Sequence, residues 1–338
     1  MRPVLIAIAR MTVLNLDPAM LNSDYLGDLF AGFWKYSRDT FGDADYFDRL
    51  PSDTDKRPPV FTPLYRDKNV LLRPGGPPVE HSAVLRALPR GKRHRHFASM
   101  RSSQALAQSV FGNLKIGKKL GCLLDLRDEN GLSLFPIADS DSCSLEYELD
   151  YLGEAERAPT SVDVMFISGY RVAVECKLAE NKFGPCSRPS LDENDPQFCD
   201  GTYSFQMNRR ERCPLTTQGI RYWEYVPPLT TWPADREQDP CPLRLTYQLF
   251  RNLLAACISP APSPKCDVSN GHVVVVSDER NPAFRPDGQA RSVFTAMKKN
   301  LKDPSRLRAC SWQQIRVAMR GDSQLHWLTD ALHRKYGF

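Results

Sequence analysis

The chain has 338 residues, of which 41% are hydrophobic and 25% are charged, a balance typical of a soluble globular protein with a sizeable core. No apolar run approaches the roughly 20 residues of a membrane-spanning helix, which argues against an integral membrane protein. The net charge of +5 permits binding to a polyanion without demanding it.

The apolar start of the chain, residues 1–14, lacks the longer apolar region and the small-residue cleavage site of a signal peptide. We therefore expect a cytoplasmic protein. The chain also carries ten cysteines. Without a signal sequence, these favour metal binding or burial over a disulfide framework.

Residues 1–97 are predicted to form an irregular N-terminal extension. They contain one aromatic-rich amphipathic stretch over 25–36, followed by a proline-rich stretch over 51–78. Proline cannot continue a helix or a central strand, so we expect little regular structure there. The densest basic cluster of the chain, residues 90–96 (RGKRHRH), closes this region.

Residues 98–338 alternate between helical and strand patterns, with a long cysteine-bearing insertion at about 181–240. Ser102 is expected to cap the first helix. The predicted elements, in chain order, are a helix over 103–114, strands over 145–152, 161–167 and 170–178, a helix over 243–258, a strand over 272–277, a helix over 291–301, a strand over 307–312 and a helix over 324–336.

This order of elements predicts an α/β fold with a mixed sheet flanked by helices. The short turn at 168–169 predicts a hairpin of the second and third strands. The unbroken apolar run over 273–276 is typical of a strand buried on both faces. We therefore expect Val164, Val174 and Val274 to lie in one core.

Three charged residues interrupt two strands that otherwise look buried. Glu175 and Lys177 lie two residues apart on the third strand, so alternation directs both side chains to the same face. Asp163 is expected to point away from the apolar face of the second strand, formed by Val162, Val164 and Phe166. If the two strands pair, the three charged groups converge.

Buried charges of this kind need compensation, and a divalent cation supplies it. Carboxylate oxygens suit Mg²⁺ or Mn²⁺. Such an ion polarises a phosphate and lowers the pKa of a bound water, while a lysine orients or deprotonates that water. A second carboxylate-x-Lys triplet, Glu180-Asn181-Lys182, follows in polar sequence. A solvated surface pair is the alternative interpretation for either triplet.

Asp163, an eleven-residue gap and Glu175-Cys176-Lys177 resemble the PD-(D/E)XK nuclease superfamily over roughly residues 100–320. More narrowly, Ser102-Ser103-Gln104-Ala105 and residues 213–226 (CPLTTQGIRYWEYV) are similar to a bacterial group of predicted restriction endonucleases. The resemblance implies Mg²⁺-dependent phosphodiester hydrolysis on a restriction-endonuclease-like fold. Asp163 and Glu175 would be metal ligands and Lys177 the catalytic lysine.

A third oxygen ligand is expected from the strand over 145–152. Alternation places Glu146, Glu148 and Asp150 on one face. We assign Glu148 to the metal, and Glu146 and Gln104 to accessory positions beside it. Many members of the superfamily carry a glutamate on the first helix, where this chain offers glutamines.

The cysteines of the insertion have two interpretations. Cys186, Cys199, Cys213 and Cys241 are candidate ligands of zinc or of an iron–sulfur cluster, since thiolates suit either. The alternative is a set of small buried residues. A shared ion requires sulfurs within about 4 Å of each other, as bonds of roughly 2.3 Å to one tetrahedral centre dictate.

Basic residues before the first helix are candidate contacts to nucleic acid, since cations there can grip phosphates. The expected contacts are an arginine at position 91 of the 90–96 cluster, followed by Lys92, Arg93, Arg95 and Arg101. A second mixture of cations and aromatics lies over 209–223, where stacking on bases and internal packing are both reasonable.

The sequence thus predicts a metal-dependent DNA endonuclease of restriction or repair type, with a homodimer as one arrangement. The alternative is a non-catalytic binding or interaction module on the same fold, or a protein centred on an iron–sulfur cluster. Degenerate members of such a fold usually lose an acid or the lysine, and this chain retains Asp163, Glu175 and Lys177.

Overall fold

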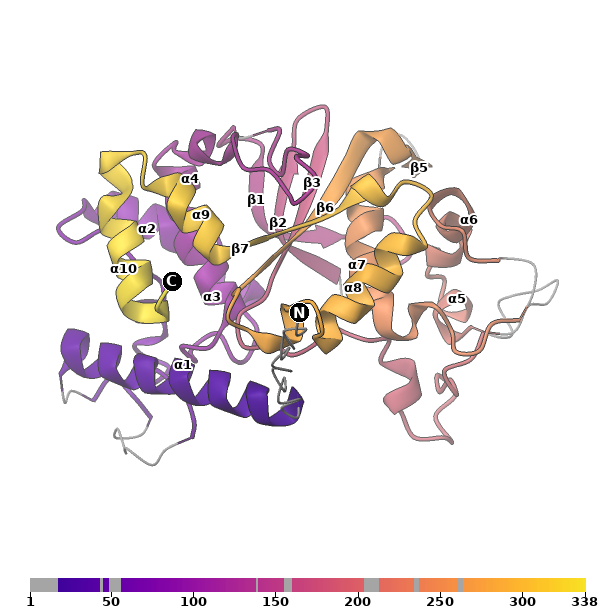
Figure 1. Cartoon of the computed structure of the whole chain (residues 1–338), viewed down its shortest axis with the longest axis horizontal. Coiled ribbons are helices and arrows are strands. Elements are labelled where there is room, and N and C mark those ends of the chain that lie inside the picture. Colours follow the sequence, from indigo (N-terminus) through magenta and orange to yellow (C-terminus); the bar gives the residue numbers. More distant parts are fainter. Residues whose placement is uncertain are drawn as a thin grey trace, which may run out of the picture.

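The computed structural model describes residues 18–42, 45–48, 56–137, 139–154, 160–203, 213–233, 237–260 and 264–338. A mixed sheet of five strands runs through the middle of the molecule (Figure 1). Its strands, in spatial order, are β1 (Cys143–Leu149), β2 (Thr160–Ile167), β3 (Arg171–Cys176), β6 (Gly271–Ser277) and β7 (Leu307–Ser311).

The sheet is antiparallel on one side and parallel on the other. β1 pairs with β2 and β2 with β3 in antiparallel fashion, whereas β6 lies parallel to both β3 and β7. The β2–β3 hairpin turns through Gly169, whose φ of +69° lies in the left-handed region that favours glycine. The predicted hairpin and the predicted mixed α/β fold are therefore confirmed.

Helices cover both faces of this sheet (Figure 1). One face carries α7 (Leu243–Cys257) and α8 (Gln289–Lys299). The opposite face carries α9 (Trp312–Met319), α10 (His326–Tyr336) and a helical stretch that begins with α3 (Ser103–Ala107) and ends with α4 (Asn113–Ile116). A π-helical turn joins α3 to α4.

Each face of the sheet has its own hydrophobic core. Val164, Val174 and Val274 are fully buried together on the α3 side, as predicted. Val273 and Val275 pack on the α7 side, so β6 is buried on both faces as its apolar run indicated.

The helix boundaries follow local chemistry. Ser102 caps α3, because its Oγ accepts a hydrogen bond of 3.2 Å from the backbone N–H of Ala105. Ser311 and Gln314 form a reciprocal capping box at the start of α9. The helices and sheet strands expected from the sequence are present, with ends that differ by a few residues.

The N-terminal residues are more regular than predicted. α1 (Pro18–Phe41) is a helix of 24 residues, and α2 (Pro78–Arg86) follows the proline-rich stretch. Leu29, Phe30 and Phe33 of α1 belong to the core on the α3 side. The aromatic amphipathic stretch over 25–36, which was expected to be part of an irregular extension, lies within α1 and adds side chains to the core on the α3 side.

The insertion after β3 contains only short elements in its described parts. These are α5 (Pro214–Thr217), α6 (Val226–Leu229) and several single turns, and a small ribbon of β4 (Ile258–Ser259) and β5 (Lys265–Cys266) follows α7. Within the described ranges, the helices are all too short or too polar to cross a membrane.

Candidate active site

Strands β2 and β3, which carry the candidate catalytic residues, stop pairing next to Asp163. Pairing of β2 with β3 ends at Val164 and Val174. At Asp163, the residue before Val164, the side-chain carboxylate contacts β3 instead of the backbone. Its Oδ2 accepts a hydrogen bond of 2.6 Å from the backbone N–H of Cys176. The acid is thereby held against β3, between Glu175 and Lys177.

The regular alternation of β2 fails at the same place. Val164 and Phe166 pack into the core on the α3 side, but Val162 packs into the core on the α7 side. The prediction that all three share one face was therefore wrong for Val162. The change coincides with the end of β2–β3 pairing at Val164 and with the left-handed φ of Glu146, which lies opposite Asp163 on β1.

Glu175 and Lys177 point to one side of β3, as alternation predicted, and both are buried. The Lys177 Nζ lies 2.9 Å from the Glu175 Oε1. Cys176 points to the other side, into the core on the α3 face.

Helix α7 supplies two amides that complete this arrangement. Gln248 donates to the Glu175 Oε1 at 2.7 Å and accepts from the Lys177 Nζ at 3.0 Å. Asn252 donates to the Glu175 Oε2 at 2.6 Å. The two amides are four residues apart, one helical turn, so they share a face of α7. Sequence analysis missed Asn252; its signal was a polar residue in an apolar helix at this spacing from Gln248.

Electrostatics at the site favour proton uptake by Asp163. Burial, with the nearby charges of Glu175 and Glu146, raises the pKa of Asp163 well above its usual value. Burial lowers the pKa of Lys177, but the carboxylates of Glu175, Glu180 and Asp163 more than offset this and leave that pKa raised. Lys177 is therefore a fixed cation at neutral pH, suited to orienting a water rather than deprotonating it.

Glu146 lies opposite Asp163 in the β1–β2 register, between the pairs Leu145–Val164 and Tyr147–Val162. Its φ of +48° is left-handed, an uncommon conformation for a residue other than glycine. The carboxylate is buried and accepts hydrogen bonds from Gln104 at 2.7 Å and from Ser161 at 2.5 Å.

The environment of Glu146 makes it the third acid of the site. Burial raises its pKa, the hydrogen bonds from Ser161 and Gln104 oppose this, and the charge of Glu175 adds to it. Glu148 lies elsewhere: its side chain is 40% exposed and its Oε2 is 3.3 Å from the Lys92 Nζ. Of the two glutamates, the structure brings Glu146, rather than the expected Glu148, close to Asp163.

Gln104 connects the acids to the basic cluster. While its amide donates to Glu146, it also donates to the backbone oxygen of Lys92 at 3.1 Å and accepts from the backbone N–H of His94 at 3.1 Å. The 90–96 segment is therefore fixed directly beside the third acid.

One of the expected phosphate contacts falls on a residue that has no side chain. The arginine contact expected at position 91 is wrong, because that residue is Gly91, which carries no charge. Gly91 is exposed in the single helical turn Arg90–Lys92. The arginine of this turn is its neighbour Arg90, so any cationic contact at this end of the cluster belongs to Arg90 or Lys92.

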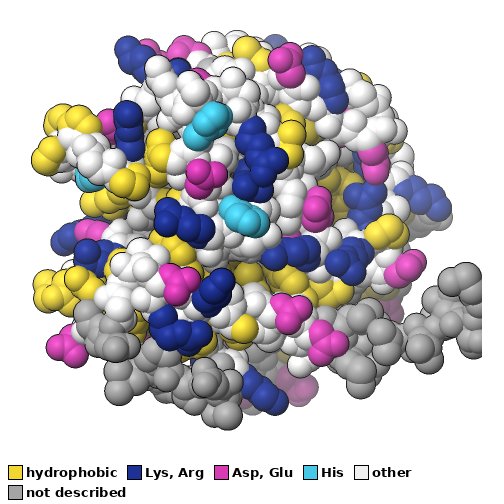
Figure 2. Space-filling view, turned by 60° about the vertical axis from the view of Figure 1, so that its left-hand side comes forward, with side chains coloured by type: hydrophobic (Ala, Val, Ile, Leu, Met, Phe, Trp, Pro, Cys, Tyr) yellow, Lys and Arg dark blue, Asp and Glu magenta, His cyan; other side chains and the backbone are white. Residues whose placement is uncertain are grey.

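The basic residues of this segment divide into two groups. Arg93 is nearly buried, pairs with Asp67 and lies 4.4 Å from the Phe97 ring centroid, and Arg90 pairs with the same Asp67 at 2.7 Å. Lys92, Arg95 and Arg101 are exposed. On the face shown in Figure 2, Lys and Arg side chains alternate with Asp and Glu instead of forming one continuous patch.

The four candidate cysteines of the insertion are all partly buried. Burial raises the pKa of Cys241 to about 12, with smaller contributions from the charges of Cys213, Cys186 and Cys199. Among the residues that the structure describes, however, no group of three or more His, Cys, Asp or Glu side chains is arranged to hold a metal ion. Zinc or iron–sulfur binding by these cysteines, and the alternative of small buried residues, both stay predictions.

Aromatic residues of the insertion serve packing. Tyr222, Trp223 and Tyr225 are buried, and Tyr222 donates to the buried Glu154 at 2.7 Å. The arginines expected beside them at 209, 210 and 212 lie outside the described residues.

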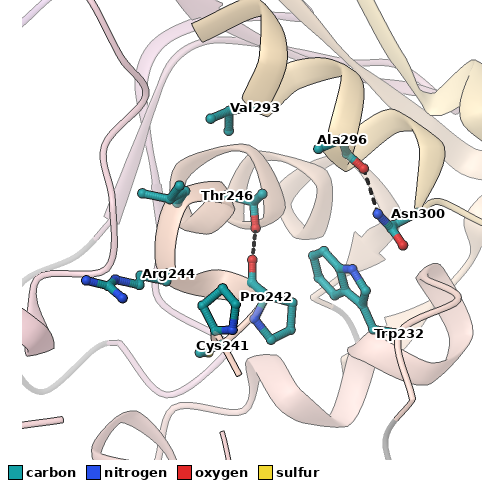
Figure 3. A pocket seen from close by; sticks show the side chains of 10 residues that line it. Trp232, Cys241, Pro242, Arg244, Thr246, Val293, Ala296 and Asn300 are labelled. Carbon is teal, nitrogen blue, oxygen red and sulfur yellow. Dashed lines mark hydrogen bonds between the residues drawn. The ribbon is translucent and has the colours of Figure 1, made fainter. Parts of the chain in front are cut away.

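A cavity of about 430 Å³ lies between α7 and α8, away from the three acids. Trp232, Val293 and Ala296 make it largely apolar, and Arg244 supplies its charge (Figure 3). It contains no carboxylate, so it offers neither the acids nor the lysine of the β2–β3 site.

The sheet, its flanking helices and the position of the acids on the hairpin are compatible with a restriction-endonuclease-like fold. A family model described as "Restriction Endonuclease associating with ARP" matches residues 65–337, and the chain belongs to this family. Comparisons with curated proteins and with solved structures gave no match. Membership supports a restriction-endonuclease-like family and a nuclease-type function.

Proposed function

We propose that this chain is a metal-dependent nuclease of the PD-(D/E)XK type that hydrolyses phosphodiester bonds in DNA. The observation that carries the proposal is the convergence of Asp163, Glu175 and Lys177 where β2 and β3 diverge. The family match supports the nuclease class, and the exposed basic residues beside the third acid support a polyanionic substrate.

The residues present fit a single divalent cation. Burial, together with the charge of Glu175, raises the pKa of Asp163, so a shared positive charge would stabilise both carboxylates. Mg²⁺ keeps several of its waters and binds through one or two carboxylates plus substrate phosphates. A preformed cage of three or more protein ligands is therefore not required, and none is present among the described side chains.

Asp163 and Glu175 would hold the ion, with Glu146 as the next nearest acid. When bound, Mg²⁺ supplies polarisation of the scissile phosphate and a water of lowered pKa. Glu175 is kept in its orientation by Gln248 and Asn252, which donate to its two oxygens. Asp163 is kept in place by the backbone N–H of Cys176.

Lys177 would act on the attacking water and on the phosphate. Its ammonium is positioned by Glu175 and Gln248, so its direction is set before substrate arrives. A fixed cation there orients the water and offsets the negative charge that develops on the phosphate. Because the neighbouring carboxylates raise the pKa of Lys177, the role proposed for it is to orient the water rather than to remove its proton.

The test is cleavage of supercoiled plasmid, linear duplex, single-stranded DNA and RNA, each with Mg²⁺, Mn²⁺ or EDTA. Wild type is compared with Asp163→Asn and with Glu129→Gln, a surface acid that pairs with Arg291 at 3.0 Å. We expect cation-dependent DNA cleavage by wild type and Glu129→Gln, and none by Asp163→Asn. Cleavage by Asp163→Asn at the wild-type rate would contradict the proposal, as would an inactive wild type on every substrate.

A further inference from the structure

The backbone that follows β3 is held by side chains from several distant elements. Lys177 donates its backbone N–H to Val276 at 2.8 Å, and its carbonyl oxygen accepts from the indole Nε1 of Trp312 at 2.9 Å. The next N–H, that of Leu178, donates to the Glu180 Oε2 at 2.7 Å. Glu180 in turn accepts from Ser103 of α3 at 2.7 Å.

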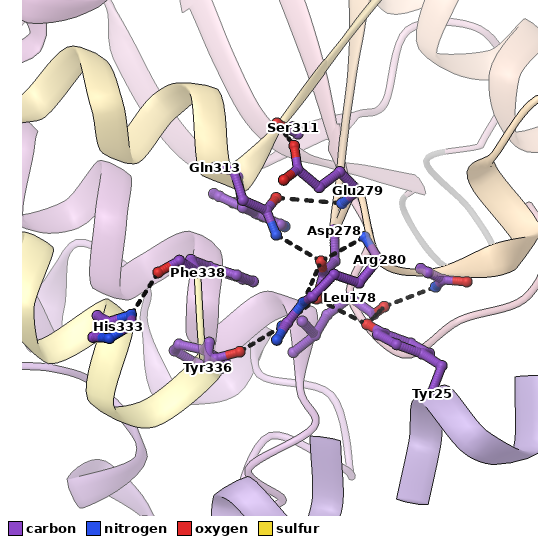
Figure 4. A network of polar contacts seen from close by, with 12 residues as sticks. Tyr25, Leu178, Asp278, Glu279, Arg280, Ser311, Gln313, His333, Tyr336 and Phe338 are labelled. Atoms are coloured by element: carbon purple, nitrogen blue, oxygen red, sulfur yellow. Dashed lines mark hydrogen bonds and ion pairs between the residues drawn. The ribbon is translucent and has the colours of Figure 1, made fainter. Parts of the chain in front are cut away.

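The carbonyl oxygen of Leu178 is the point where the N-terminal helix reaches this segment. It accepts from the Tyr25 hydroxyl at 2.8 Å and from the Asn281 Nδ2 at 2.9 Å (Figure 4). Tyr25 lies on α1, 153 positions earlier in the chain. Tyr25 therefore contacts the residue that follows Lys177, where the chain leaves the sheet after β3.

Tyr25 also touches a second buried group. Its hydroxyl lies 3.1 Å from the Asp278 Oδ2, just after β6. Asp278 is fully buried and is bound by Arg280 at 2.6 Å and by Gln313 at 2.7 Å. Arg280 continues to the backbone oxygen of Tyr336 at the end of α10 (Figure 4).

Leu178 and Asp278 each have donors other than Tyr25, so a role of Tyr25 in positioning can be separated from a role in stability. Without the Tyr25 hydroxyl, Leu178 keeps Asn281 as a donor, and Asp278 keeps Arg280 and Gln313. No buried acceptor is left unpaired, so the loss of stability should be small. What is lost is a lateral restraint on the backbone that carries Lys177.

We propose that Tyr25 is a positioning residue for Lys177, and that α1 is therefore part of the active-site assembly. The helix lies outside the residues matched by the family model, which begin at 65. The inference rests on the proposed nuclease function, because the residue it positions is the lysine that acts there.

The control is a second buried tyrosine on the same helix. Tyr36 is 9% exposed against 8% for Tyr25, and it lies eleven residues further along α1, roughly 16 Å by helical rise. Its ring contacts Phe41, with centroids 6.1 Å apart, at the far end of the helix. Tyr25→Phe and Tyr36→Phe thus each remove one hydroxyl from a buried ring.

Two readouts test the proposal on the full chain. In single-turnover plasmid cleavage with Mg²⁺, we expect Tyr25→Phe to lower the rate roughly tenfold, since small misplacements of catalytic groups are costly. Its DNA affinity should remain that of wild type. Tyr36→Phe should stay within about twofold of the wild-type rate, because it leaves the restraint on Leu178 intact.

The second readout does not require cleavage. Lys177 reactivity towards an amine-labelling reagent, measured by mass spectrometry at pH 8, should change severalfold in Tyr25→Phe and not in Tyr36→Phe. Equal effects of the two variants on both readouts, or none from Tyr25→Phe, would overturn the proposal. If wild type cleaves nothing but the labelling difference is present, the nuclease assignment fails while the positioning of Lys177 by Tyr25 stands.

Discussion

The Asp163 carboxylate accepts a 2.6 Å hydrogen bond from the backbone N–H of Cys176, where β2 and β3 no longer pair. The side chain thus occupies a place that a strand backbone would otherwise fill. This contact retains a buried acid in a position where Glu175 and Glu146 repel it. An uncharged side chain of the same shape can accept the same bond.

Asp163→Asn should therefore abolish cleavage and stabilise the metal-free protein. The amide oxygen still accepts from Cys176, while the buried charge and its repulsion disappear. Because the folded state raises the pKa of Asp163, removing the carboxylate should increase the free energy of unfolding at pH 7. Urea denaturation in EDTA measures it, and a less stable variant would contradict the explanation.

The pH dependence of that gain has a definite sign. The unfolded chain releases the Asp163 proton near the usual value of 3.8, and the folded chain releases it only at higher pH. The folded state therefore binds more protons in between, and its stability declines as pH rises from 3.8 through the folded pKa. The advantage of Asp163→Asn should be small at pH 4 and grow towards pH 7. Thermal denaturation of both proteins in EDTA across this pH range measures the advantage. An advantage that stays constant with pH would contradict the explanation.

Lys177→Met should have the opposite effect on stability. It leaves the buried Glu175 without its cation, and breaking a buried pair typically costs about 3 to 5 kcal/mol. Gln248 and Asn252 still bind the carboxylate, so the lower end is expected, with partial recovery when Mg²⁺ is added. The cleavage rate should fall by about 10² to 10⁴, because the water loses its orienting partner.

Lys182→Met is the matched control for this change. Lys182 ends the second carboxylate-x-Lys triplet, and its side chain is exposed. Its substitution should leave stability and rate close to wild type. The pKa of Lys177 is raised above its usual 10.5. The wild-type pH–rate profile between pH 6 and 9 should therefore contain no ionisation step that is missing from the profile of Lys177→Met. An ionisation of that kind would identify Lys177 as a base.

Strand alternation correctly predicted that Glu175 and Lys177 share a face, because β3 keeps its regular pairing with β6 through Cys176. Alternation failed at Val162, where β2 no longer pairs with β3. It also failed to single out Glu146, which has a left-handed backbone conformation on β1. Such breaks depend on neighbouring strands, which a single sequence does not specify. The amphipathic stretch over 25–36 did not by itself predict the length of α1, because this helix acquires its stability from tertiary packing that composition alone does not reveal.

Glu146→Gln and Glu148→Gln separate the two candidate third acids. Glu146 is buried beside Asp163, whereas Glu148 is part exposed and pairs with Lys92. We expect the first substitution to lower the cleavage rate at least about tenfold, as the loss of a charged neighbour of the metal site implies. The second should change it by less than about twofold, since exposed pairs contribute little. Plasmid nicking at a series of Mg²⁺ concentrations compares them, and the reverse ranking would restore Glu148 as the third acid.

The salt dependence of DNA binding should separate the basic residues beside the site. Each phosphate contact that is lost reduces the slope of log affinity against log salt by about 0.9 for duplex DNA. Lys92→Ala, Arg95→Ala and Arg101→Ala, introduced together into the Asp163→Asn protein, should therefore lower the slope by roughly 2 to 3.

Arg93→Ala provides the contrast within the same segment. The Arg93 side chain is only 3% exposed, pairs with Asp67 and lies over the Phe97 ring, so its loss should destabilise the fold and leave the slope unchanged. Fluorescence anisotropy with a labelled duplex at several salt concentrations measures the slope, and thermal denaturation measures the stability. A slope that the triple variant leaves intact would show that DNA contacts the protein elsewhere. A slope reduced by Arg93→Ala alone would place that buried guanidinium, rather than its exposed neighbours, against the phosphates.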